Sequence, residues 1–404
     1  MDRKLNIVLV SNLYSPNVIG GAEILVSFLA ETLAAQQHKV TVISTMGPSK
    51  ETIHRSCING VDIIRFFPKN LYWLYQKENP NIIKRAAWHV VDAWNYSTVK
   101  PFRQLLMSIK PDIIHTHNID GFSPVIWSES KKLGLPVIHT AHDYHYLCPR
   151  STLLKRSSEI CTNPSIICQI YRKWYASQMA NIDCFSSPSQ FLLDIYKQSG
   201  VDFKRSTIVR NGVIAEKIVD AVVDCSQEKN RINLLYLGQL SEHKGVSTLL
   251  RAFERISPTQ RYILNIAGKG PLEDEINEIA KTNPYIKYHG FISGEKKKEL
   301  IKCSDALVIP SEWYENAPIS VLEAYHHGVP VISSNIGGLP ELVQHNENGL
   351  LFEMGQADSF ASQLKRMADP ALVKQLKIGA LKSGQHYTAK QMTEDYLRLY
   401  SELI

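Results

Sequence analysis

The sequence predicts an α/β protein of two domains, each built on a parallel sheet, with the two sheets facing across a cleft. Short apolar runs alternate with helical patterns, an order that produces parallel strands joined by crossover helices. The alternation is lost over residues 214–231 and then restarts, which indicates a connection between domains. At 404 residues the chain also exceeds the ~250–300 residues at which a single core stops growing. We therefore expect a first domain over residues 1–212 and a second from residue 213.

The first domain is predicted to hold buried strands, because its apolar runs lack the polar alternation of a sheet with one face in water. A helix from about Ala22 to Gln37 follows the first strand, after a loop that contains Gly20 and Gly21. The predicted strands are Leu5–Ser11, Lys39–Thr45, Val61–Phe67, Asp112–Asn118, Pro136–Asp143, Asp183–Ser189 and Ser206–Val213.

The second domain repeats this pattern. A helical pattern over Leu272–Asn283 separates two of its apolar runs, and the chain from about Asp358 onward is mostly helical. The predicted strands are Ile232–Gln239, Tyr262–Gly268, Ile286–Phe291, Ala306–Ser311, Pro330–Ser334 and Gly349–Glu353. Two such sheets joined end to end are expected to place a ligand cleft between their carboxyl edges.

Composition and charge limit the cellular setting. No apolar run approaches the ~18 residues that a membrane-spanning helix needs, and the start lacks a signal-peptide cleavage pattern. The 7 cysteines fit a reducing compartment better than a disulfide framework, so we expect a cytoplasmic protein. Residues 1–212 hold 24 Lys+Arg against 15 Asp+Glu, whereas residues 213–404 hold 21 against 24. This asymmetry either indicates an anionic surface or acceptor for the first half or is chance drift.

Residues 69–107 depart from the strand–helix alternation. The segment is basic and rich in aromatic residues: Tyr72, Trp73, Tyr75, Lys77, Lys84, Arg85, Trp88 and Trp94. This combination suits an interfacial helix on an anionic membrane surface. The alternative is a pair of crossover helices whose aromatic side chains pack on the sheet.

The stretch Pro310–Glu341 carries the strongest functional signal. Pro318 begins a helix, where its missing N–H costs nothing, and the helix start faces the carboxyl ends of two strands, where open α/β sheets bind ligands. First-turn amides at such a start form an anion site. Glu315 precedes the helix and Glu323 lies in its second turn, and a carboxylate suits a pair of vicinal hydroxyls. An acid on a surface helix is otherwise simply solvated.

Two strand-to-helix turns could bind phosphate. Gly20 and Gly21 form the first turn, where glycine allows close backbone approach. The equivalent turn of the second half, Gly238–Gly245, places Lys244 where its ammonium could neutralise a diphosphate. The spacing of a dinucleotide-binding loop is absent, and neither a P-loop nor a serine nucleophile elbow is present.

Histidines and cysteines leave a metal site open as a minor alternative. His142 ends a predicted strand and faces the cleft, and His115, His117, His139 and His145 also lie near strand ends. No single element carries them at metal-ligand spacing. Cys148, Cys161 and Cys168 could hold a structural zinc with a fourth ligand, although ordinary buried thiols are the favoured interpretation.

Together these motifs resemble glycosyltransferase family 4, whose retaining, nucleotide-sugar-dependent members have two Rossmann-like domains in the GT-B architecture. The resemblance covers nearly the whole chain, and the stretch from Glu315 to Glu341 is its most specific part. The other matching motifs are GGAE (Gly20–Glu23), HTAHD (His139–Asp143), RNGV (Arg210–Val213), GQLSEHKGVSTLL (Gly238–Leu250) and GKGPLE (Gly268–Glu273). It implies a donor domain over residues 213–385 and a terminal helix over residues 386–404 that crosses back to the first domain.

The resemblance also implies residue roles. Glu315 would contact the donor sugar, Glu323 the ribose and Lys244 the diphosphate, with help from the amides of Ile319 and Ser320. The implied catalytic residues are Glu315, His142 and Lys244. The implied donor-binding residues are Gly20, Gly21, Gln239, Lys244, Gly290, Phe291, Glu315, Asn316, Ala317, Pro318, Ile319, Ser320 and Glu323. The catalytic residue His142 would touch the sugar. Gly20 and Gly21 would approach the donor phosphates or the acceptor, and the base would lie near Gly290 and Phe291.

One position departs from the family pattern. Gln239 stands where the family commonly has an arginine that pairs with the lysine on the diphosphate. Glutamine supplies no charge. Either Lys244 works with another base, such as Lys269 or Arg210, or the donor is held less tightly.

The implied function is transfer of a sugar, with retention, to a glycan or lipid-linked acceptor. A UDP-sugar donor is favoured and a GDP-sugar is possible. The expected setting is surface polysaccharide synthesis, with peripheral contact to the inner face of the cell membrane through residues 69–107. We expect no cofactor, no metal and no nucleic-acid partner, because helix N-termini and lysine bind the diphosphate. Two alternatives remain: a sugar-nucleotide epimerase of the same architecture, and a catalytically silent partner subunit.

Overall fold

The computed structural model describes residues 3–76, 80–155, 157–214, 231–256 and 261–404. The chain divides into two compact units, each with its own sheet. Unit 1 comprises residues 1–153, 162–212 and 389–404, and unit 2 comprises residues 154–161 and 213–388. The connection expected over residues 214–231 lies almost entirely outside the described residues.

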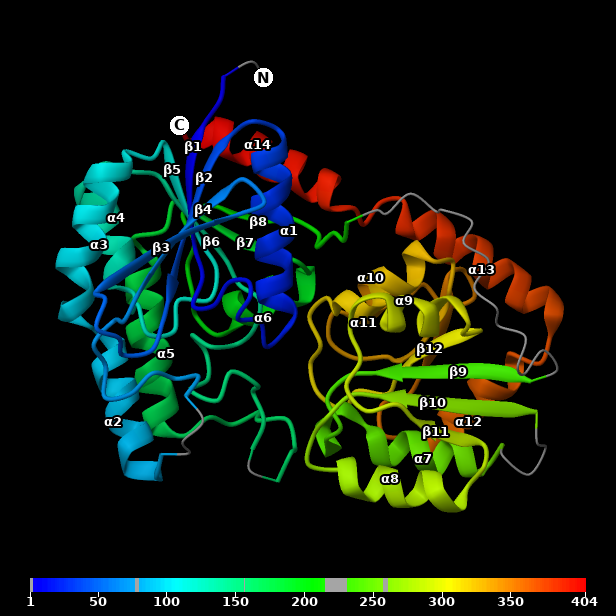
Figure 1. The fold of residues 1–404 in the computed structure, drawn as a ribbon. Coiled ribbons are helices and arrows are strands. Elements are labelled where there is room, and N and C mark those ends of the chain that lie inside the picture. The colour runs from blue at the N-terminus through cyan, green and yellow to red at the C-terminus, as the bar shows by residue number, and fades with distance from the viewer. Residues whose placement is uncertain (1–2, 77–79, 156, 215–230, 257–260) are drawn as a thin grey trace. The chain divides into compact units, whose positions relative to one another are not determined.

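Within the described residues, unit 1 contains an eight-stranded sheet in the order β3-β4-β2-β1-β5-β6-β7-β8 (Figure 1). The strands are β1 (Asn6–Val10), β2 (Lys39–Thr45), β3 (Ile53–Ile58), β4 (Val61–Phe66), β5 (Ile113–Thr116), β6 (Val137–Thr140), β7 (Cys184–Ser187) and β8 (Ser206–Ile208). The expected parallel sheet is thus confirmed except at its edge, where β3 pairs antiparallel with β4. Sequence analysis missed β3 because its side chains are mostly exposed, so it has no apolar run.

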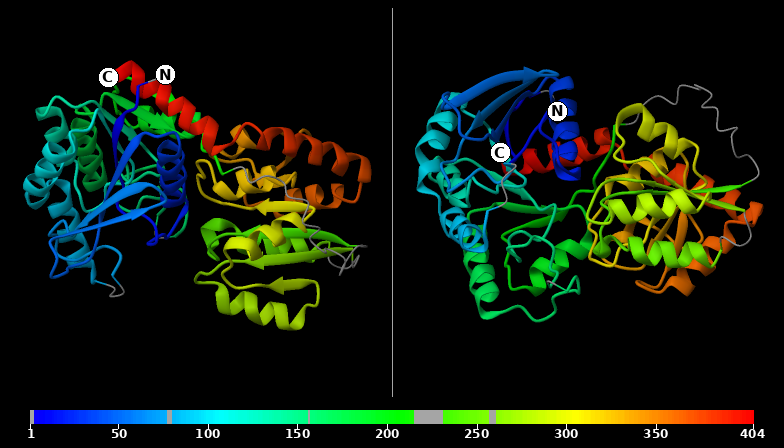
Figure 2. Two further views of the ribbon diagram at one scale, coloured as in Figure 1. Left: turned by 45° about the horizontal axis from the view of Figure 1, so that its top comes forward. Right: turned by 60° about the horizontal axis from the view of Figure 1, so that its bottom comes forward.

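Helices pack around the unit 1 sheet: α1 (Gly21–Ala35), α2 (Ile82–Ala93), α3 (Tyr96–Ile109), α4 (Val125–Lys132), α5 (Ile166–Met179), α6 (Gln190–Gln198) and α14 (Ala389–Leu403). The last of these, α14, belongs to unit 1 and lies beside α1 (Figures 1 and 2). The Tyr396 hydroxyl lies 2.9 Å from Thr140 Oγ1, and the Tyr400 hydroxyl lies 2.7 Å from Nδ1 of His115. These buried hydrogen bonds fix the terminal helix to the middle of the sheet.

Unit 2 contains a six-stranded parallel sheet within the described residues, in the order β11-β10-β9-β12-β13-β14. The strands are β9 (Ile232–Leu237), β10 (Tyr262–Ala267), β11 (Ile286–Tyr288), β12 (Ala306–Ile309), β13 (Val331–Ser334) and β14 (Gly349–Phe352). The helical elements are η2 (Glu242–Lys244), α7 (Val246–Glu254), α8 (Glu273–Thr282), α9 (Gly294–Lys302), α10 (Ile319–His326), α11 (Leu339–Leu342), α12 (Ala357–Arg366) and α13 (Pro370–Gly384). All six predicted strands are therefore present.

Each sheet has one point at which the strand order reverses. In unit 1 the chain moves outward from β1 through β2 to one edge and from β5 through β6 to the other, so the reversal lies between β1 and β5. In unit 2 the reversal lies between β9 and β12. The carboxyl ends of the two strands at such a point leave a crevice where open α/β sheets bind ligands. Functional residues are therefore expected at these two crevices.

Candidate active site

Lys244 and Glu315 meet at the crevice of unit 2. Lys244 ends η2, after β9, and Glu315 lies in the loop after β12. Their Nζ and Oε1 atoms are 2.7 Å apart, with side chains 20% and 10% exposed. The turns approach closely because Gly245 has a φ of 73°, and an added Cβ would lie 1.7 Å from the carbonyl oxygen of Pro310. Only glycine fits here, so the turn sequence itself brings this pair together.

The carboxylate of Glu315 is kept ionised by its partners. Burial acts to raise its pKa, but the Lys244 ammonium and a 2.7 Å hydrogen bond from the Ser311 hydroxyl hold the pKa below its usual value. The Lys244 ammonium also lies over the Trp313 ring, 4.3 Å from its centroid. The site therefore presents a fixed cation and a fixed anion side by side.

Glu323 is also paired. Its Oε1 lies 2.6 Å from Nζ of Lys297 on α9, and the two side chains are 22% and 25% exposed. Sequence analysis named Glu323 but not Lys297, because the two residues are far apart in sequence and an exposed helical lysine carries no signal. Glu323 thus keeps a second carboxylate oxygen for a ligand hydroxyl while Lys297 orients the first.

The start of α10 carries the expected anion-binding geometry. Pro318 caps the helix with an extended backbone, and Ile319 begins the first turn. Amides of a first helical turn have no preceding helical carbonyl to bind. Asn316 and Ala317, which connect Glu315 to the helix, are buried. A backbone hydrogen bond holds this loop in place, because the Gly338 amide donates to the Glu315 carbonyl at 2.6 Å.

Gln239 lies exposed in the turn after β9, and its carbonyl accepts a 2.7 Å hydrogen bond from the Tyr236 hydroxyl. This turn packs against the turn after β10, where the Leu240 amide donates to the Lys269 carbonyl at 2.9 Å. Lys269 therefore lies in the turn next to Gln239 within unit 2, whereas Arg210 belongs to unit 1. The structure thus places one of the two suggested substitute bases beside Gln239.

Gly290 and Phe291 follow β11. Gly290 has a φ of 65°, and its carbonyl accepts from the Gly268 amide at 2.9 Å. Phe291 is 69% exposed, which is unusual for a large apolar side chain. An exposed aromatic ring thus lies at the end of the β10–β11 half of the sheet.

In unit 1, Gly20 and Gly21 form the start of α1 after β1. The Gly20 amide donates to Oε2 of Glu23 at 2.7 Å, a bond that links the helix cap to a buried acid. Both glycines are exposed. The expected strand–glycine turn–helix arrangement is present.

The histidines fall into different environments. His142 Nε2 lies 3.0 Å from Nδ1 of His117, and burial lowers the pKa of His142 to about 4. His142 is therefore a neutral imidazole near pH 7, which can donate or accept a hydrogen bond but supplies no charge. His115 and His139 bond hydroxyls inside the sheet and support packing.

Among the described residues, no group of three or more His, Cys, Asp or Glu side chains is placed to hold a metal ion. Cys148, Cys161 and Cys168 are free thiols.

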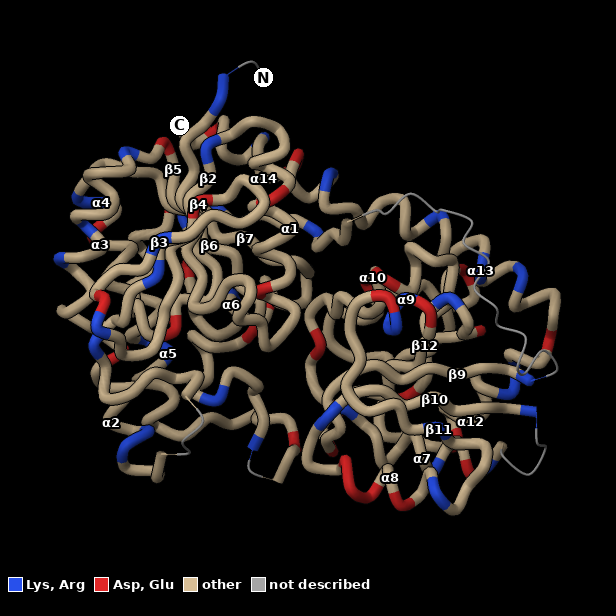
Figure 3. Tube along the Cα trace, viewed as in Figure 1, with Lys and Arg blue, Asp and Glu red and all other residues tan. Residues whose placement is uncertain are grey.

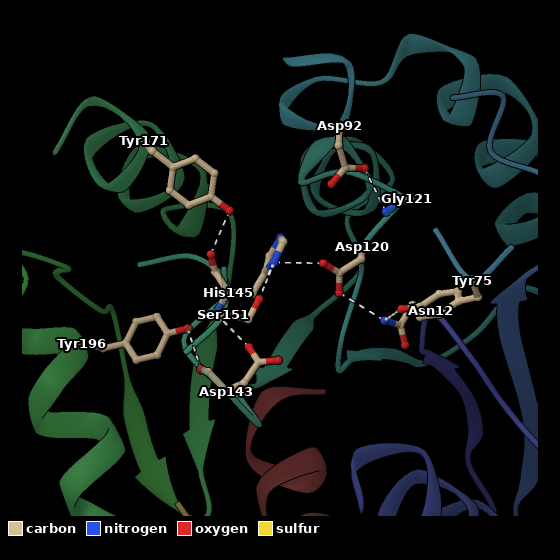
Figure 4. A network of polar contacts seen from close by, with 10 residues as sticks. All are labelled: Asn12, Tyr75, Asp92, Asp120, Gly121, Asp143, His145, Ser151, Tyr171 and Tyr196. Carbon is tan, nitrogen blue, oxygen red and sulfur yellow. Dashed lines mark hydrogen bonds and ion pairs between the residues drawn. The ribbon is translucent and has the colours of Figure 1, made fainter. Parts of the chain in front are cut away.

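A polar network that sequence analysis did not predict occupies the crevice of unit 1. Figure 4 shows Asp120 between His145 and Asn12, which come from the loops after β5, β6 and β1. Nδ1 of His145 lies 2.9 Å from Oδ1 of Asp120, and the Asn12 amide donates to Oδ2 of Asp120 at 3.1 Å. The His145 amide donates to Oδ1 of Asp143 at 2.8 Å. The network thus joins the three loops at the carboxyl edge of this sheet.

Charge in this network is concentrated on His145. Burial acts to lower its pKa, but the adjacent Asp120 carboxylate raises the pKa of His145 to about 9. Burial raises the pKa of Asp143 to about 6 and that of Asp92 to about 8. The pKa of Asp120 is lowered despite burial because His145 faces it. At neutral pH the imidazolium of His145 and the carboxylate of Asp120 form a buried ion pair.

The aromatic residues of the segment 69–107 are largely directed inward. Tyr72 and Trp88 are buried, and Nε1 of Trp88 donates to the Tyr72 carbonyl at 3.0 Å. The Tyr75 hydroxyl bonds the amide of Asn12. Two of these aromatic side chains are thus packed inside unit 1, as the alternative of crossover helices expects, and the segment forms α2 and α3. Membrane contact through this segment stays a prediction. No helix among the described residues has the length and apolar character needed to cross a membrane.

Comparisons with known proteins agree with this geometry. Residues 19–217 match the family described as Glycosyltransferase Family 4, and residues 225–379 match Glycosyl transferases group 1. An uncharacterised 42.6 kDa protein in the cps region of Klebsiella pneumoniae is 30% identical over 343 residues, which cover 84% of this chain and 87% of that protein. A UDP-Gal:alpha-D-GlcNAc-diphosphoundecaprenol alpha-1,3-galactosyltransferase of Escherichia coli is 27% identical over 66% of this chain and 68% of its own length.

Solved structures share the fold. Sucrose-phosphate synthase from Thermosynechococcus elongatus superimposes with a TM-score of 0.75 at 20% identity, over 98% of both chains. HepE of Anabaena, solved in complex with UDP, superimposes with a TM-score of 0.70 at 16% identity, over 98% of this chain and 100% of its own. At these identities the likeness concerns the fold, which is the GT-B arrangement of two Rossmann-like units.

Proposed function

This chain belongs to the glycosyltransferases of family 4 and group 1, and we propose that it transfers a sugar from a nucleotide-sugar donor to a glycan or lipid-linked acceptor with retention of configuration. The observation that carries the proposal is the Lys244–Glu315 pair at the β9/β12 crevice, beside the start of α10. A fixed cation and a helix N-terminus suit the donor diphosphate, and a fixed carboxylate suits sugar hydroxyls.

The departing diphosphate gains negative charge as the glycosidic bond breaks. The Lys244 ammonium and the amides of Ile319 and Ser320 stabilise that charge, and they act without reorganisation because they are already in place. Glu315 does not attack the sugar in this proposal. Its ion pair with Lys244 keeps it ionised, and it accepts hydrogen bonds from sugar hydroxyls. Retention then follows from departure and attack on one face through an oxocarbenium-like transition state.

The remaining donor contacts are assigned by chemistry. Glu323, which Lys297 orients, accepts hydrogen bonds from the two ribose hydroxyls. The base lies against the backbone and ring at Gly290 and Phe291. In unit 1, His142 contacts the sugar as a neutral imidazole, and Gly20 and Gly21 approach the phosphates or the acceptor.

A UDP-sugar is the preferred donor in this proposal, with a GDP-sugar as the alternative. Support comes from HepE, which was solved with UDP and with UDP-glucose, and from the galactosyltransferase of Escherichia coli, whose name specifies UDP-Gal. That enzyme acts on a diphosphoundecaprenol-linked acceptor, and another relative serves amylovoran biosynthesis in Erwinia amylovora. We place this chain in surface polysaccharide synthesis, in the cytoplasm and peripheral to the inner face of the cell membrane. The diphosphate is held without metal or cofactor.

The test is a panel of nucleotide sugars measured by thermal shift. At 100-fold excess over Kd, a bound donor adds ~2.7 kcal/mol to the unfolding free energy of the unit that binds it, which corresponds to a few degrees in Tm. We expect UDP-sugars to give this shift in the wild-type chain and in Lys281→Ala, an exposed ion-pair lysine of unit 2, but not in Lys244→Ala. Absence of a shift with every nucleotide would sink the proposal in favour of a silent subunit. Conversion of the donor into another nucleotide sugar without acceptor would instead indicate an epimerase.

A further inference from the structure

Two helices of unit 1 begin with an exposed pair of isoleucines. Ile82 and Ile83 follow the cap of α2 and are 66% and 76% exposed. Ile166 and Ile167 follow the cap of α5 and are 75% and 78% exposed. Ile170, one turn further along α5, is 64% exposed. We call these five residues the isoleucine patch.

The patch is not a by-product of poor packing. On each helix the opposite face is buried, through Trp88 on α2 and Tyr175 on α5. Asn81 and Ser165 cap the two helices with side-chain hydrogen bonds of 2.9 Å and 3.3 Å, so both starts are well formed. Isolated exposed apolar residues are ordinary, but five isoleucines at two helix starts form a concentration of apolar surface that normally marks a contact site.

The two helices are joined. Nε1 of Trp174 on α5 donates to the Ala93 carbonyl at the end of α2, at 3.1 Å. The rings of Trp94 and Trp174 are 6.0 Å apart. Figure 1 shows α2 and α5 next to each other in unit 1 with their first turns toward the same end of the unit. The isoleucines therefore lie at the starts of two joined helices whose first turns face the same end of unit 1.

The charges on these helices have one sign outside the core. Helices α2, α3 and α5 carry six basic residues, which are Lys84, Arg85, Lys100, Arg103, Arg172 and Lys173. Their one acidic residue, Asp92, is buried and accepts the Gly121 amide at 2.8 Å. In Figure 3 the start of α2 is blue, whereas the start of α8 in unit 2 is red. An apolar surface flanked by basic side chains matches an anionic bilayer, which offers an apolar interior beneath negative headgroups.

We propose that the isoleucine patch inserts into an anionic lipid bilayer while Lys84, Arg85 and Lys173 contact its headgroups. The proposal rests on the proposed function, in that a lipid-linked acceptor requires the enzyme at a membrane. It assigns the contact to the first turns of α2 and α5, not to the aromatic residues of segment 69–107. Helix α5 has no part in the membrane region expected from the sequence.

The test is co-sedimentation of the full chain with vesicles of phosphatidylcholine alone or with 30% phosphatidylglycerol (about that fraction suffices to give a negative surface). We expect binding that depends on phosphatidylglycerol. Ile166→Ser with Ile167→Ser removes apolar area and is expected to lower the partition coefficient about tenfold or more. Lys84→Gln with Arg85→Gln is expected to lower it about fivefold for each charge removed, and to weaken its dependence on phosphatidylglycerol.

A matched control is Ile378→Ser with Leu381→Ser on α13 of unit 2, where the side chains are 61% and 41% exposed. This control should leave vesicle binding unchanged. The inference fails if the isoleucine variant sediments like the control, or if self-association without vesicle binding shows the patch to be a protein interface. Calorimetric measurement of nucleotide binding by the wild-type chain and by the same variants separates the two proposals. If the wild-type chain binds no nucleotide, the proposed function is overturned, whereas the vesicle-binding result still stands by itself.

Discussion

The two crevices of this protein are built in opposite ways. In unit 2 the cation of the pair keeps partial contact with water, since Lys244 is 20% exposed while its partner Glu315 is 10% exposed. In unit 1 the Asp120–His145 pair is more enclosed, at 12% and 5%, within a network that includes Asp92 and Asp143. Both lie where the strand order reverses. The two pairs thus lie at equivalent positions of the two sheets, but their side chains differ in exposure and in the number of charged neighbours.

The difference follows from electrostatics. The Lys244 ammonium of unit 2 keeps partial contact with water, so it is suited to binding and releasing an anionic ligand. A buried ion pair has lost its hydration and cannot separate without a large free-energy cost. The unit 1 network is therefore suited to holding three loops in one arrangement, on which acceptor contacts can be built. The predictions below test this division, from the largest expected effect to the smallest.

Asp120→Ala leaves the His145 imidazolium buried without its partner. We expect the unfolding free energy of unit 1 to fall by roughly 3–5 kcal/mol, the usual cost of breaking a buried pair. Urea denaturation measures it. Asp358→Ala, which removes an exposed ion pair with Arg255 in unit 2, serves as control and should cost less than about 1 kcal/mol. Equal losses would remove the distinction between the two regions.

Lys244→Ala removes the cation that we propose binds the donor diphosphate. We expect kcat to fall by roughly 100- to 1,000-fold, since charge develops there in the transition state. The unfolding free energy should also fall, because the buried Glu315 carboxylate loses its cationic partner and keeps only the hydrogen bond from the Ser311 hydroxyl. A steady-state assay and a denaturation curve on one preparation give both values. A variant with near wild-type turnover would contradict the role assigned to the lysine.

Alkaline pH should destabilise unit 1 selectively. The native state holds the His145 proton up to about pH 9, whereas the unfolded chain loses it near 6.5. The stability from this proton is complete below pH 6.5 and is lost as the pH rises to 9, at most on the order of 3 kcal/mol. Burial raises the pKa of Asp92 to about 8, so the unfolding free energy also falls through this group as the pH rises toward 8. His145→Gln should flatten the pH dependence of the urea midpoint between about pH 6.5 and 9 and should leave the fall due to Asp92 in place.

Glu323→Ala should act on donor affinity more than on chemistry. The carboxylate accepts ribose hydroxyls that do not change charge in the reaction, so we expect KM for the donor to rise about tenfold with a smaller effect on kcat. Lys297→Ala, which only orients Glu323, should raise KM by less. A fall in kcat with unchanged KM would move Glu323 to the reacting centre.

Gln239→Arg should produce the smallest effect and a gain. An arginine in this exposed turn would add a second cation for the diphosphate, and we expect donor affinity to rise by about two- to tenfold. Calorimetric titration with the nucleoside diphosphate measures it. If affinity does not change, Lys269 already fills that role, and Lys269→Ala in the wild-type background should then weaken binding.

Local sequence was sufficient for most of the fold. Buried strands can be recognised in the sequence as apolar runs. The antiparallel strand β3 was missed because none of its side chains is buried. Lys244, Glu315 and Glu323 were identified because each belongs to a turn or helix start whose geometry follows from nearby glycine and proline. Their partner Lys297 was not, because it lies on a different helix.

What the sequence alone determined is therefore the alternation of elements, the two sheets and the residues set beside glycine turns, since these depend on interactions between near neighbours. Only the tertiary structure decided which side chains meet from distant loops. It joined Asn12, Asp120 and His145 into one network and turned Trp88 inward. It also left the isoleucines of α2 and α5 exposed together. Burial and charge pairing are properties of the packed chain, so no short stretch of sequence encodes them.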